Sequence, residues 1–276
     1  MNSGDTSEVT IDKTPKITIV TVVFNDEINI EETIISVINQ TYGNLEYIIV
    51  DGGSTDKTLT LIKKYRNSIT NFISEPDNGI YYAMNKGIDL ATGEWILFLN
   101  SGDRLLDSQT LEKIDFNHPE KVQIIYGDVE GRFPGFSRIY KAGDLNDLPY
   151  TMQFSHQSTF FRTSLHRLNK YSVEYDFASD FHFILSQYLV DPNKFIYQPI
   201  VVSSVSTGGI SDKKTYLSVV ERWKIVKVFE LDSPSVRFYY YFALLSQFIK
   251  PFLFKESNLD RFRKIKYKLF SITIKP

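Results

Sequence analysis

Strand-like and helix-like patterns alternate along the first part of the chain. Short runs of apolar and β-branched residues predict strands, at residues 17–24, 45–50, 69–73 and 95–99. The segments between them repeat apolar residues at helical spacing and predict helices, at residues 30–38, 59–65 and 80–91. This order is typical of an α/β fold with a mostly parallel central sheet and helices on both of its faces.

The second part of the chain is less regular. Further apolar runs predict strands, at residues 122–126, 136–140, 158–161 and 195–205, the last interrupted by Pro199. Helical spacing recurs at residues 178–189, 217–229 and 235–254. A change in composition near Asp212 predicts an α/β domain at residues 16–212 and a helical, basic and aromatic annex at residues 213–276. Residues 1–15 are polar, and we interpret them as a mobile leader.

Composition narrows the class of protein. The chain has 276 residues, which is enough for one large domain with a small annex. It contains no cysteine, which excludes disulfide bonds, cysteine-bound zinc, iron–sulfur clusters and cysteine nucleophiles. The net charge of −2 gives no reason to expect nucleic acid as a partner. Because no run has a signal-peptide core or reaches the ~18 apolar residues of a membrane span, we expect a cytoplasmic protein.

Positive charge is concentrated in the annex. Residues 237–276 carry nine Lys or Arg and two acids, a net charge of +7, whereas the preceding residues sum to −9. Aromatic residues crowd the same segment. Helices of this composition can lie on an anionic membrane surface, which would place the protein peripherally on the inner face of the membrane. Alternatively, the aromatic side chains pack on the rest of the chain or on a second copy in a homo-oligomer.

Polar clusters follow three of the predicted strands, at residues 21–27, 51–56 and 100–103. Ligands of open parallel sheets bind beyond the carboxyl ends of the strands, so we expect these clusters to meet at one edge. The sequence lacks a dinucleotide Gly-x-Gly-x-x-Gly fingerprint, a Walker A motif, a Gly-x-Ser-x-Gly elbow and paired histidines at metal-binding spacing. What remains is a sheet edge rich in carboxylates, Asn, Ser and Gly.

Asp103 ends the third of these clusters on a tight turn. A carboxylate in such a place suits Mg²⁺ or Mn²⁺, which take oxygen ligands and often bind together with substrate phosphates. The small neighbours Ser101 and Gly102 would let a diphosphate approach the backbone. The structural alternative is that Asp103 shapes the turn or caps a helix that begins near Ser108.

Several motifs, in this order and spacing, resemble the donor-binding half of family 2 inverting glycosyltransferases, which have the GT-A fold. They are Asp-Gly-Gly-Ser-Thr-Asp at residues 51–56, Asn-Gly-Ile-Tyr-Tyr-Ala-Met-Asn-Lys-Gly at 78–87 and Phe-Leu-Asn-Ser-Gly-Asp at 98–103. The resemblance continues through His-Gln-Ser-Thr-Phe-Phe at 156–161 and Ala-Ser-Asp at 178–180, and covers about residues 15 to 212.

The resemblance implies a nucleotide-diphosphate sugar as donor, with a UDP-sugar as the expected one, and Mn²⁺ or Mg²⁺ as cofactor. It assigns donor binding to residues of the first three loops, namely Thr21, Phe24, Asn25, Asp51, Asn100 and Asp103. Among these, Asp51 matches the acid that contacts the base or ribose, and Asp103 matches the metal-binding acid of the DxD-like motif. The sequence departs from the family pattern at Gly52, where a second acid is common, and at Met84, where many members carry Arg.

The resemblance also assigns the chemistry. Asp180 matches the general base, although a helix N-cap is the structural alternative. His156 faces the acceptor or diphosphate, or is a hydrogen-bonded core histidine. Lys86 neutralises phosphate, or belongs to a solvated helix face. The implied activity is inverting transfer of a sugar to a hydroxyl of a glycan or lipid-linked acceptor in polysaccharide or glycolipid synthesis; the alternatives are a nucleotidyltransferase and a non-catalytic nucleotide-sugar-binding protein.

Overall fold

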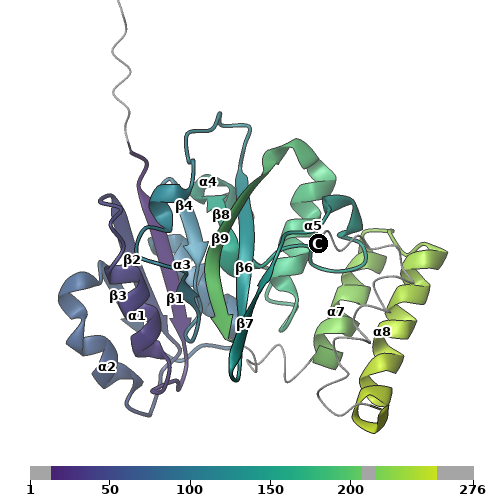
Figure 1. Ribbon diagram of the computed structural model, residues 1–276, viewed down its shortest axis with the longest axis horizontal. Coiled ribbons are helices and arrows are strands. Elements are labelled where there is room, and N and C mark those ends of the chain that lie inside the picture. Colours follow the sequence, from purple (N-terminus) through teal and green to yellow (C-terminus); the bar gives the residue numbers. More distant parts are fainter. Residues whose placement is uncertain (1–13, 207–214, 254–276) are drawn as a thin grey trace, which may run out of the picture.

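The computed structural model describes residues 14–206 and 215–253, with side chains in the last helix described as far as Gln247. Within these residues one nine-stranded sheet has the order β3-β2-β1-β4-β8-β6-β9-β5, with β7 beside β6 (Figure 1). The strands are β1 (Ile17–Val23), β2 (Leu45–Asp51), β3 (Asn71–Ser74), β4 (Trp95–Phe98), β5 (Arg104–Leu105), β6 (Ile124–Phe133), β7 (Phe136–Tyr140), β8 (Thr159–Arg162) and β9 (Phe195–Ser206).

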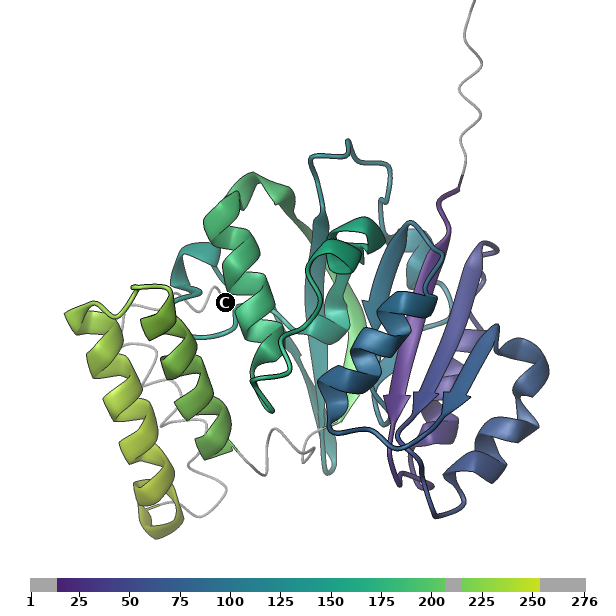
Figure 2. The ribbon, with the colours of Figure 1, turned by 180° about the vertical axis from the view of Figure 1, so that it is seen from behind.

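Helices flank this sheet on both faces (Figures 1 and 2). Those packed near the sheet are α1 (Ile30–Ile38), α2 (Thr58–Lys64), α3 (Ile80–Leu90), α4 (Thr163–Leu168) and α5 (Ser179–Val190), while α7 (Thr215–Val228) lies beside α5 and α8 (Pro234–Leu253) lies beyond α7. Short 3₁₀ turns include η1 (Arg66–Ser68), η2 (Leu111–Lys113) and η4 (His156–Ser158). The α/β class and the helical C-terminal region are as the sequence predicts, and the strands and helices expected from periodicity are found with ends shifted by a few residues.

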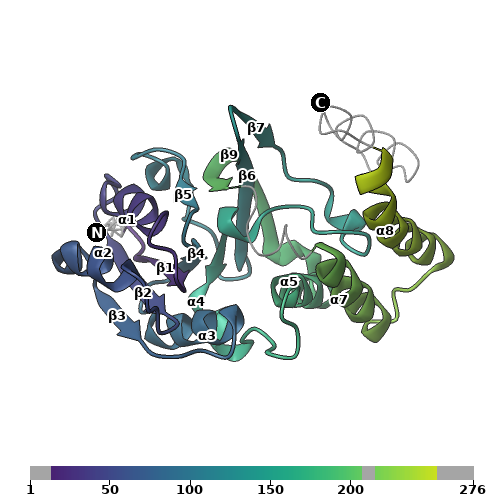
Figure 3. The same ribbon diagram turned by 90° about the horizontal axis from the view of Figure 1, so that it is seen from below.

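Strand direction differs between the two halves of the sheet. The first half is parallel, because β1 pairs in parallel with β2 and β4, and β2 with β3. In the second half β8 is antiparallel to both β4 and β6, while β6 and β9 are parallel to each other. The carboxyl ends of β1, β2, β4, β6 and β9 therefore share one edge, which faces the reader in Figure 3.

Pro199 does not interrupt β9, which runs continuously past it. The register between β6 and β9 shifts between Tyr126 and Val129, which indicates a β-bulge at the level of Pro199. A Cβ on Gly127 would lie 2.5 Å from the carbonyl oxygen of Ile200. Glycine at this position lets the two backbones approach at the bulge, so the strand continues where a proline was expected to break it.

Alternation of side chains along the strands builds a core on each face of the sheet. On one face, Ile17 and Ile19 of β1 join a cluster with the buried side of α1. On the other face, Val20 and Val22 join a larger cluster that includes Met84 and Ile88 of α3 and the apolar face of α5. The sheet is thus buried on both sides, which explains the nearly continuous apolar runs of β1, β2 and β4.

The two C-terminal helices extend the larger of these clusters rather than building a core of their own. Val226 of α7 and Val236, Tyr239 and Tyr240 of α8 are buried in it. The Tyr240 ring stacks on Trp223 at 5.9 Å. These aromatic side chains therefore pack on the rest of the chain, as one of the two interpretations of the annex expects. Most of the leader predicted at residues 1–15, namely residues 1–13, lies outside the described residues, as do the domain boundary near Asp212 and the basic segment after residue 253.

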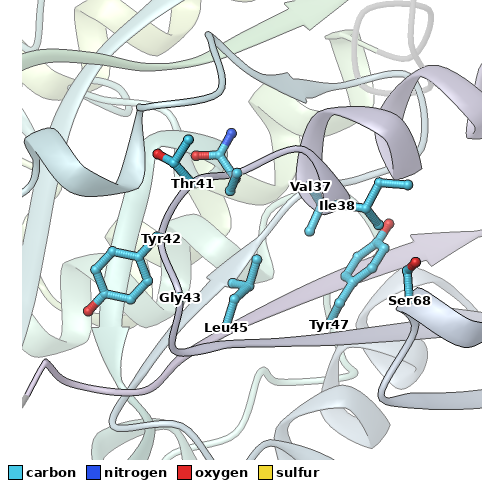
Figure 4. A pocket seen from close by; sticks show the side chains of 9 residues that line it. Val37, Ile38, Thr41, Tyr42, Gly43, Leu45, Tyr47 and Ser68 are labelled. Carbon is cyan, nitrogen blue, oxygen red and sulfur yellow. The ribbon is translucent and has the colours of Figure 1, made fainter.

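A pocket of about 290 Å³ lies away from the polar loops (Figure 4). It opens at the start of β2, where the end of α1 approaches η1. It is lined by residues such as Tyr42, Leu45 and Ser68, at the end of β2 opposite to Asp51.

In the described part of the chain, no helix has the length and apolar character needed to cross a membrane.

His166 of α4 is completely buried among aromatic rings. Its ring stacks on Phe183 at 4.1 Å and packs against the rings of Phe98, Phe161 and Tyr171. Burial lowers the pKa of His166 to about 3, because the apolar surroundings penalise the charged imidazolium. The folded protein therefore holds this histidine neutral at neutral and mildly acidic pH.

This burial predicts a pH-dependent stability. Between about pH 6.5 and pH 3 the unfolded chain binds a proton at His166 that the folded chain does not, so the free energy of unfolding falls as the pH is lowered. The slope from this group approaches ~1.4 kcal/mol per pH unit. Urea titrations between about pH 7 and about pH 4.5, a span of ~2.5 units, should show a shallower pH dependence for His166→Phe than for the wild type. Equal slopes in the two proteins would contradict this assignment.

Candidate active site

The first two predicted loops are joined directly by hydrogen bonds. The Asn25 N–H donates to Ser54 Oγ at 2.8 Å, and the Thr55 N–H donates to Asn25 Oδ1 at 2.8 Å. Asn25 adopts a left-handed backbone conformation with φ of 48°, which asparagine tolerates better than most residues. Asn25 therefore fixes the shape of both loops at the ends of β1 and β2.

The third loop joins the same cluster. Ser101 Oγ donates to Asp26 Oδ2 at 2.7 Å, and the Gly102 N–H donates to Thr33 Oγ1 at 3.0 Å. Thr33 in turn donates to the backbone carbonyl of Asp103 at 2.7 Å. The three polar segments predicted from the sequence thus meet at one edge of the sheet, as expected.

Asp51 ends β2 and lies inside the turn that follows this strand. Its side chain is completely buried, and its carboxylate accepts hydrogen bonds from the N–H groups of Gly53 and Ser54 and from the hydroxyls of Ser54 and Ser74. Asp51 therefore holds the turn after β2 in shape, and most of its acceptor sites are already used.

The two remaining residues predicted to line the nucleoside have opposite surroundings. Thr21 is completely buried in β1, where its hydroxyl lies 3.1 Å from the Tyr47 hydroxyl, so the structure does not bring it to the loop surface. The alternation of β1 explains this, because Thr21 shares a face with Ile19 and Val23, toward α1. Phe24 follows the strand and is 63% exposed beside the second loop.

Asp103 lies in the third loop with its carboxylate nearly enclosed. The residue is 6% exposed, and its carboxylate accepts from the Gln157 side chain at 3.1 Å and from the Ser206 N–H at 3.1 Å. The alternative that it caps a helix near Ser108 is wrong, because the carboxylate turns toward η4 and β9, and the next helical turn, η2, begins at Leu111.

The surroundings of Asp103 fit a divalent cation. Burial raises the pKa of its carboxyl group to about 6, against the smaller lowering effects of Ser206, His156, Gln157 and Arg132. Among the described residues, Asn100 Oδ1 in the same turn is buried without a hydrogen-bond partner. A carboxylate and an amide oxygen are ligands that Mg²⁺ and Mn²⁺ accept. No group of three or more potential ligands is assembled within the described residues, so a donor diphosphate would have to complete the coordination.

His156 connects the third loop to α5. Its Nδ1 lies 3.0 Å from Asp180 Oδ2, and its Nε2 lies 3.4 Å from the side-chain nitrogen of Asn100. The imidazole can donate from Nδ1 to the Asp180 carboxylate, and this contact joins η4 to α5. Because the neighbouring Gln157 contacts Asp103, the η4 turn brings the carboxylates of Asp103 and Asp180 to the same region.

Asp180 lies in the first turn of α5, and its side chain is 16% exposed. Its Oδ1 accepts from the Tyr81 hydroxyl at 3.0 Å and from the Phe181 N–H at 2.8 Å. Burial raises the pKa of Asp180, but the hydrogen bonds and charge of His156, with those of Phe181 and Tyr81, outweigh it and lower the pKa. The N-cap alternative is wrong, because Ala178 occupies the N-cap position.

Lys86 contacts acids between β3 and α3 rather than Asp103. Its ammonium forms ion pairs with Asp77 and, at 2.7 Å, with Glu75. Partial burial lowers the pKa of Lys86, but these two carboxylates outweigh that effect and raise it. The contacts exclude the interpretation of Lys86 as a purely solvated residue.

Sequence reasoning missed several residues that the structure brings into the cluster. They are Tyr81, Gln157 and Ser206, which contact Asp180 or Asp103 directly. Tyr81 and Gln157 stand within the motifs at residues 78–87 and 156–161, so their place in a motif was the available signal. Ser206 carries no such signal, because its contribution is a backbone N–H.

Comparison with known proteins identifies the class. The profile of the family described as Glycosyl transferase family 2 matches residues 18–184. The chain therefore belongs to glycosyl transferase family 2 and is a glycosyl transfer enzyme. A PGL/p-HBAD biosynthesis glycosyltransferase of Mycobacterium bovis is 34% identical over 184 residues, which cover 64% of this chain and 72% of that protein.

Solved structures with the same fold include two glycosyltransferases. S. aureus TarS 1-349 in complex with UDP-GlcNAc has a TM-score of 0.63 and 22% identity, over 88% of this chain and 74% of that one. Glucosyl-3-phosphoglycerate synthase from Mycobacterium tuberculosis, in complex with Mn²⁺, UDP and glucosyl-3-phosphoglycerate, has a TM-score of 0.53 and 16% identity, over 76% and 80% of the two chains. These likenesses confirm the GT-A fold.

Proposed function

We propose that the chain is an inverting glycosyltransferase that moves a sugar from a UDP-sugar to an acceptor hydroxyl. The observation that carries the proposal is the meeting of Asp103 and Asp180 across the η4 turn, with Gln157 on one carboxylate and His156 on the other. The nucleotide and metal in the complexes of related enzymes, UDP-GlcNAc in one and UDP with Mn²⁺ in the other, support the choice of donor and cofactor.

Asp180 acts as the general base in this proposal. The acceptor hydroxyl attacks the anomeric carbon from the face opposite the diphosphate, the new carbon–oxygen bond forms as the bond to phosphate breaks, and the hydroxyl proton passes to the carboxylate. The lowered pKa keeps Asp180 ionised and therefore able to accept a proton. His156, Tyr81 and the Phe181 N–H fix its orientation and leave about one of its roughly four lone-pair sites for the acceptor.

Asp103 serves the leaving group. With the oxygen of Asn100 in the same turn, its carboxylate would hold a divalent cation that neutralises charge as it develops on the diphosphate. Gln157 and Ser206 orient the carboxylate, and Arg132, which donates to the Gly102 carbonyl, adds positive charge nearby. The general base Asp180 and the cation-binding Asp103 are thereby positioned by separate sets of residues.

The variant Asp180→Asn tests whether Asp180 is the general base. Asparagine keeps the size of the side chain but cannot take the proton, so turnover should fall by at least ~10²-fold while UDP binding with Mn²⁺ stays unchanged. Steady-state kinetics and calorimetric titration with UDP measure the two effects. Asp176→Asn, an exposed acid shortly before α5, is the matched control and should keep full activity. A fully active Asp180→Asn enzyme would remove this residue from the mechanism.

Asp103→Asn tests the cation site. Loss of the charged ligand should weaken Mn²⁺-dependent UDP binding on the order of tenfold or more, while the small binding that remains without metal is unaffected. Asp107→Asn, just after β5 and paired with Lys113 at the surface, should leave Mn²⁺ dependence as in the wild type. If Asp103→Asn binds UDP with the same dependence on Mn²⁺ concentration, the cation is held elsewhere.

The acceptor side of the proposal involves the annex. On α8, Tyr241 and Leu245 are 58% and 55% exposed, on the helix face opposite the buried Tyr239 and Tyr240. The nine Lys or Arg of residues 237–276 complement an anionic surface. We propose that this helix face rests on an anionic lipid surface and so brings the enzyme to a lipid-linked or surface glycan acceptor.

A double substitution of the exposed α8 residues tests this contact. Tyr241→Ser with Leu245→Ser removes buried apolar area at the lipid boundary and should reduce sedimentation with phosphatidylglycerol vesicles by at least about tenfold. Leu168→Ser, an 84% exposed leucine on α4, should sediment like the wild type. Unchanged vesicle binding together with a lower oligomeric mass would instead identify the helix face as a contact between two copies of the chain.

A further inference from the structure

One buried carboxylate on the nucleoside side is not used by the proposed mechanism. Asp77 lies just before α3, and its side chain is 7% exposed. One oxygen, Oδ1, is ion-paired with Lys86. Among the described residues, the other oxygen, Oδ2, is buried and has no hydrogen-bond partner. A buried acceptor without a donor is costly, so such an atom points to a ligand that supplies the donor.

The position of this oxygen is fixed by its neighbours Gly52 and Phe24. A Cβ on Gly52 would lie 3.6 Å from Asp77 Oδ2 and 3.4 Å from Cδ2 of Phe24. The Gly52 N–H continues the strand pairing by donating to the Val23 carbonyl, so glycine here supplies room rather than an unusual backbone conformation. Phe24 is 63% exposed and free to rotate on a fast timescale, so its ring can give way to a planar ligand or stack against it.

We infer that Asp77 Oδ2, rather than Asp51, reads the base of the donor nucleotide by accepting a hydrogen bond from an imide N–H. The carboxylate of Asp51 accepts hydrogen bonds within the turn after β2. Oδ2 of Asp77, in contrast, has no hydrogen-bond partner among the described residues and lies beside the same turn. Asp77 thereby supplies an acid beside position 52, where this chain has glycine. The inference rests on the proposed function, because it concerns the donor of that reaction.

The arrangement selects among the bases. Uracil and thymine present one imide N–H between two carbonyl oxygens, which matches one free acceptor on Asp77 with the Lys86 ammonium as a donor beside it. Guanine presents two N–H groups side by side and needs both carboxylate oxygens, one of which Lys86 already occupies. Cytosine presents a ring nitrogen acceptor in place of the imide N–H, and this lone pair would face the carboxylate.

Asp77→Asn tests the inference through base preference. The amide oxygen remains the acceptor for Lys86, so the amide NH₂ turns toward the base and meets the imide N–H of uracil donor to donor. Calorimetric titration with excess Mn²⁺ should show UDP binding weakened about ten- to a hundredfold. CDP, whose ring nitrogen now meets a donor, should bind as in the wild type or more tightly, so the preference for UDP over CDP falls by at least about tenfold.

Two further variants serve as a control and as a second test of the space beside Asp77. Asp89→Asn removes an exposed acid of α3 that is paired with Lys170, and it should leave the affinities for UDP and CDP unchanged. Gly52→Ala places a Cβ at ordinary contact distance from Phe24 and Asp77, so the fold tolerates it while the space beside Oδ2 is filled. This variant should weaken UDP and CDP to a similar degree and leave the urea midpoint near that of the wild type.

The outcomes separate the inference from the proposed function. A folded Asp77→Asn protein with the wild-type ratio of UDP to CDP affinity overturns the inference, as does a wild-type enzyme that binds GDP more tightly than UDP. Either result leaves glycosyl transfer by Asp180 and Asp103 in place. A wild-type protein that binds none of the three nucleoside diphosphates in the presence of Mn²⁺ overturns the inference and the proposed function together.

Discussion

The direction of β8 is the constraint on which the candidate site depends. The parallel strands β1, β2 and β4 deliver their following loops to one edge of the sheet, and this alone gathers the acidic and amide side chains. Because β8 runs antiparallel to β4, it begins at that same edge, and the η4 turn before it places His156 beside Asn100. A parallel β8 would have put this histidine at the opposite edge, away from Asp103.

Two nearly enclosed carboxylates at this edge respond to burial in opposite ways. Asp103 meets two neutral N–H donors, which do not offset the loss of water, so its pKa rises to about 6. Asp180 meets an imidazole, a phenol and a backbone N–H, which together outweigh burial and lower its pKa. A carboxylate whose pKa stays raised despite its neighbours suits a cation, whereas one held ionised by fixed donors suits proton transfer, and this difference separates the two proposed roles.

The sequence predicts the elements and the meeting of the loops, because periodicity and strand order determine both. It does not predict which way a side chain turns at the end of a strand. Thr21 and Asp51 stand in the expected loops or strands but are directed inward, since alternation along β1 and the donors of the second turn decide their orientation. The contact of Tyr81 with Asp180 joins residues far apart in the chain, and only tertiary packing brings them together.

Helix α3 links the two sides of the site in one rigid element. Lys86 pairs with Asp77 on the proposed nucleoside side, and Tyr81 donates to Asp180 on the proposed acceptor side. The helix is seated closely on β1, because a Cβ on Gly87 would lie 2.4 Å from Val20. Since that contact fixes the height of α3 above the sheet, it also positions the α3 residues that hold Asp77 and Asp180. A larger residue at Gly87 would displace Lys86 and Tyr81 together, so the two proposed roles, reading of the nucleobase by Asp77 and proton transfer to Asp180, would depend on the same packing contact.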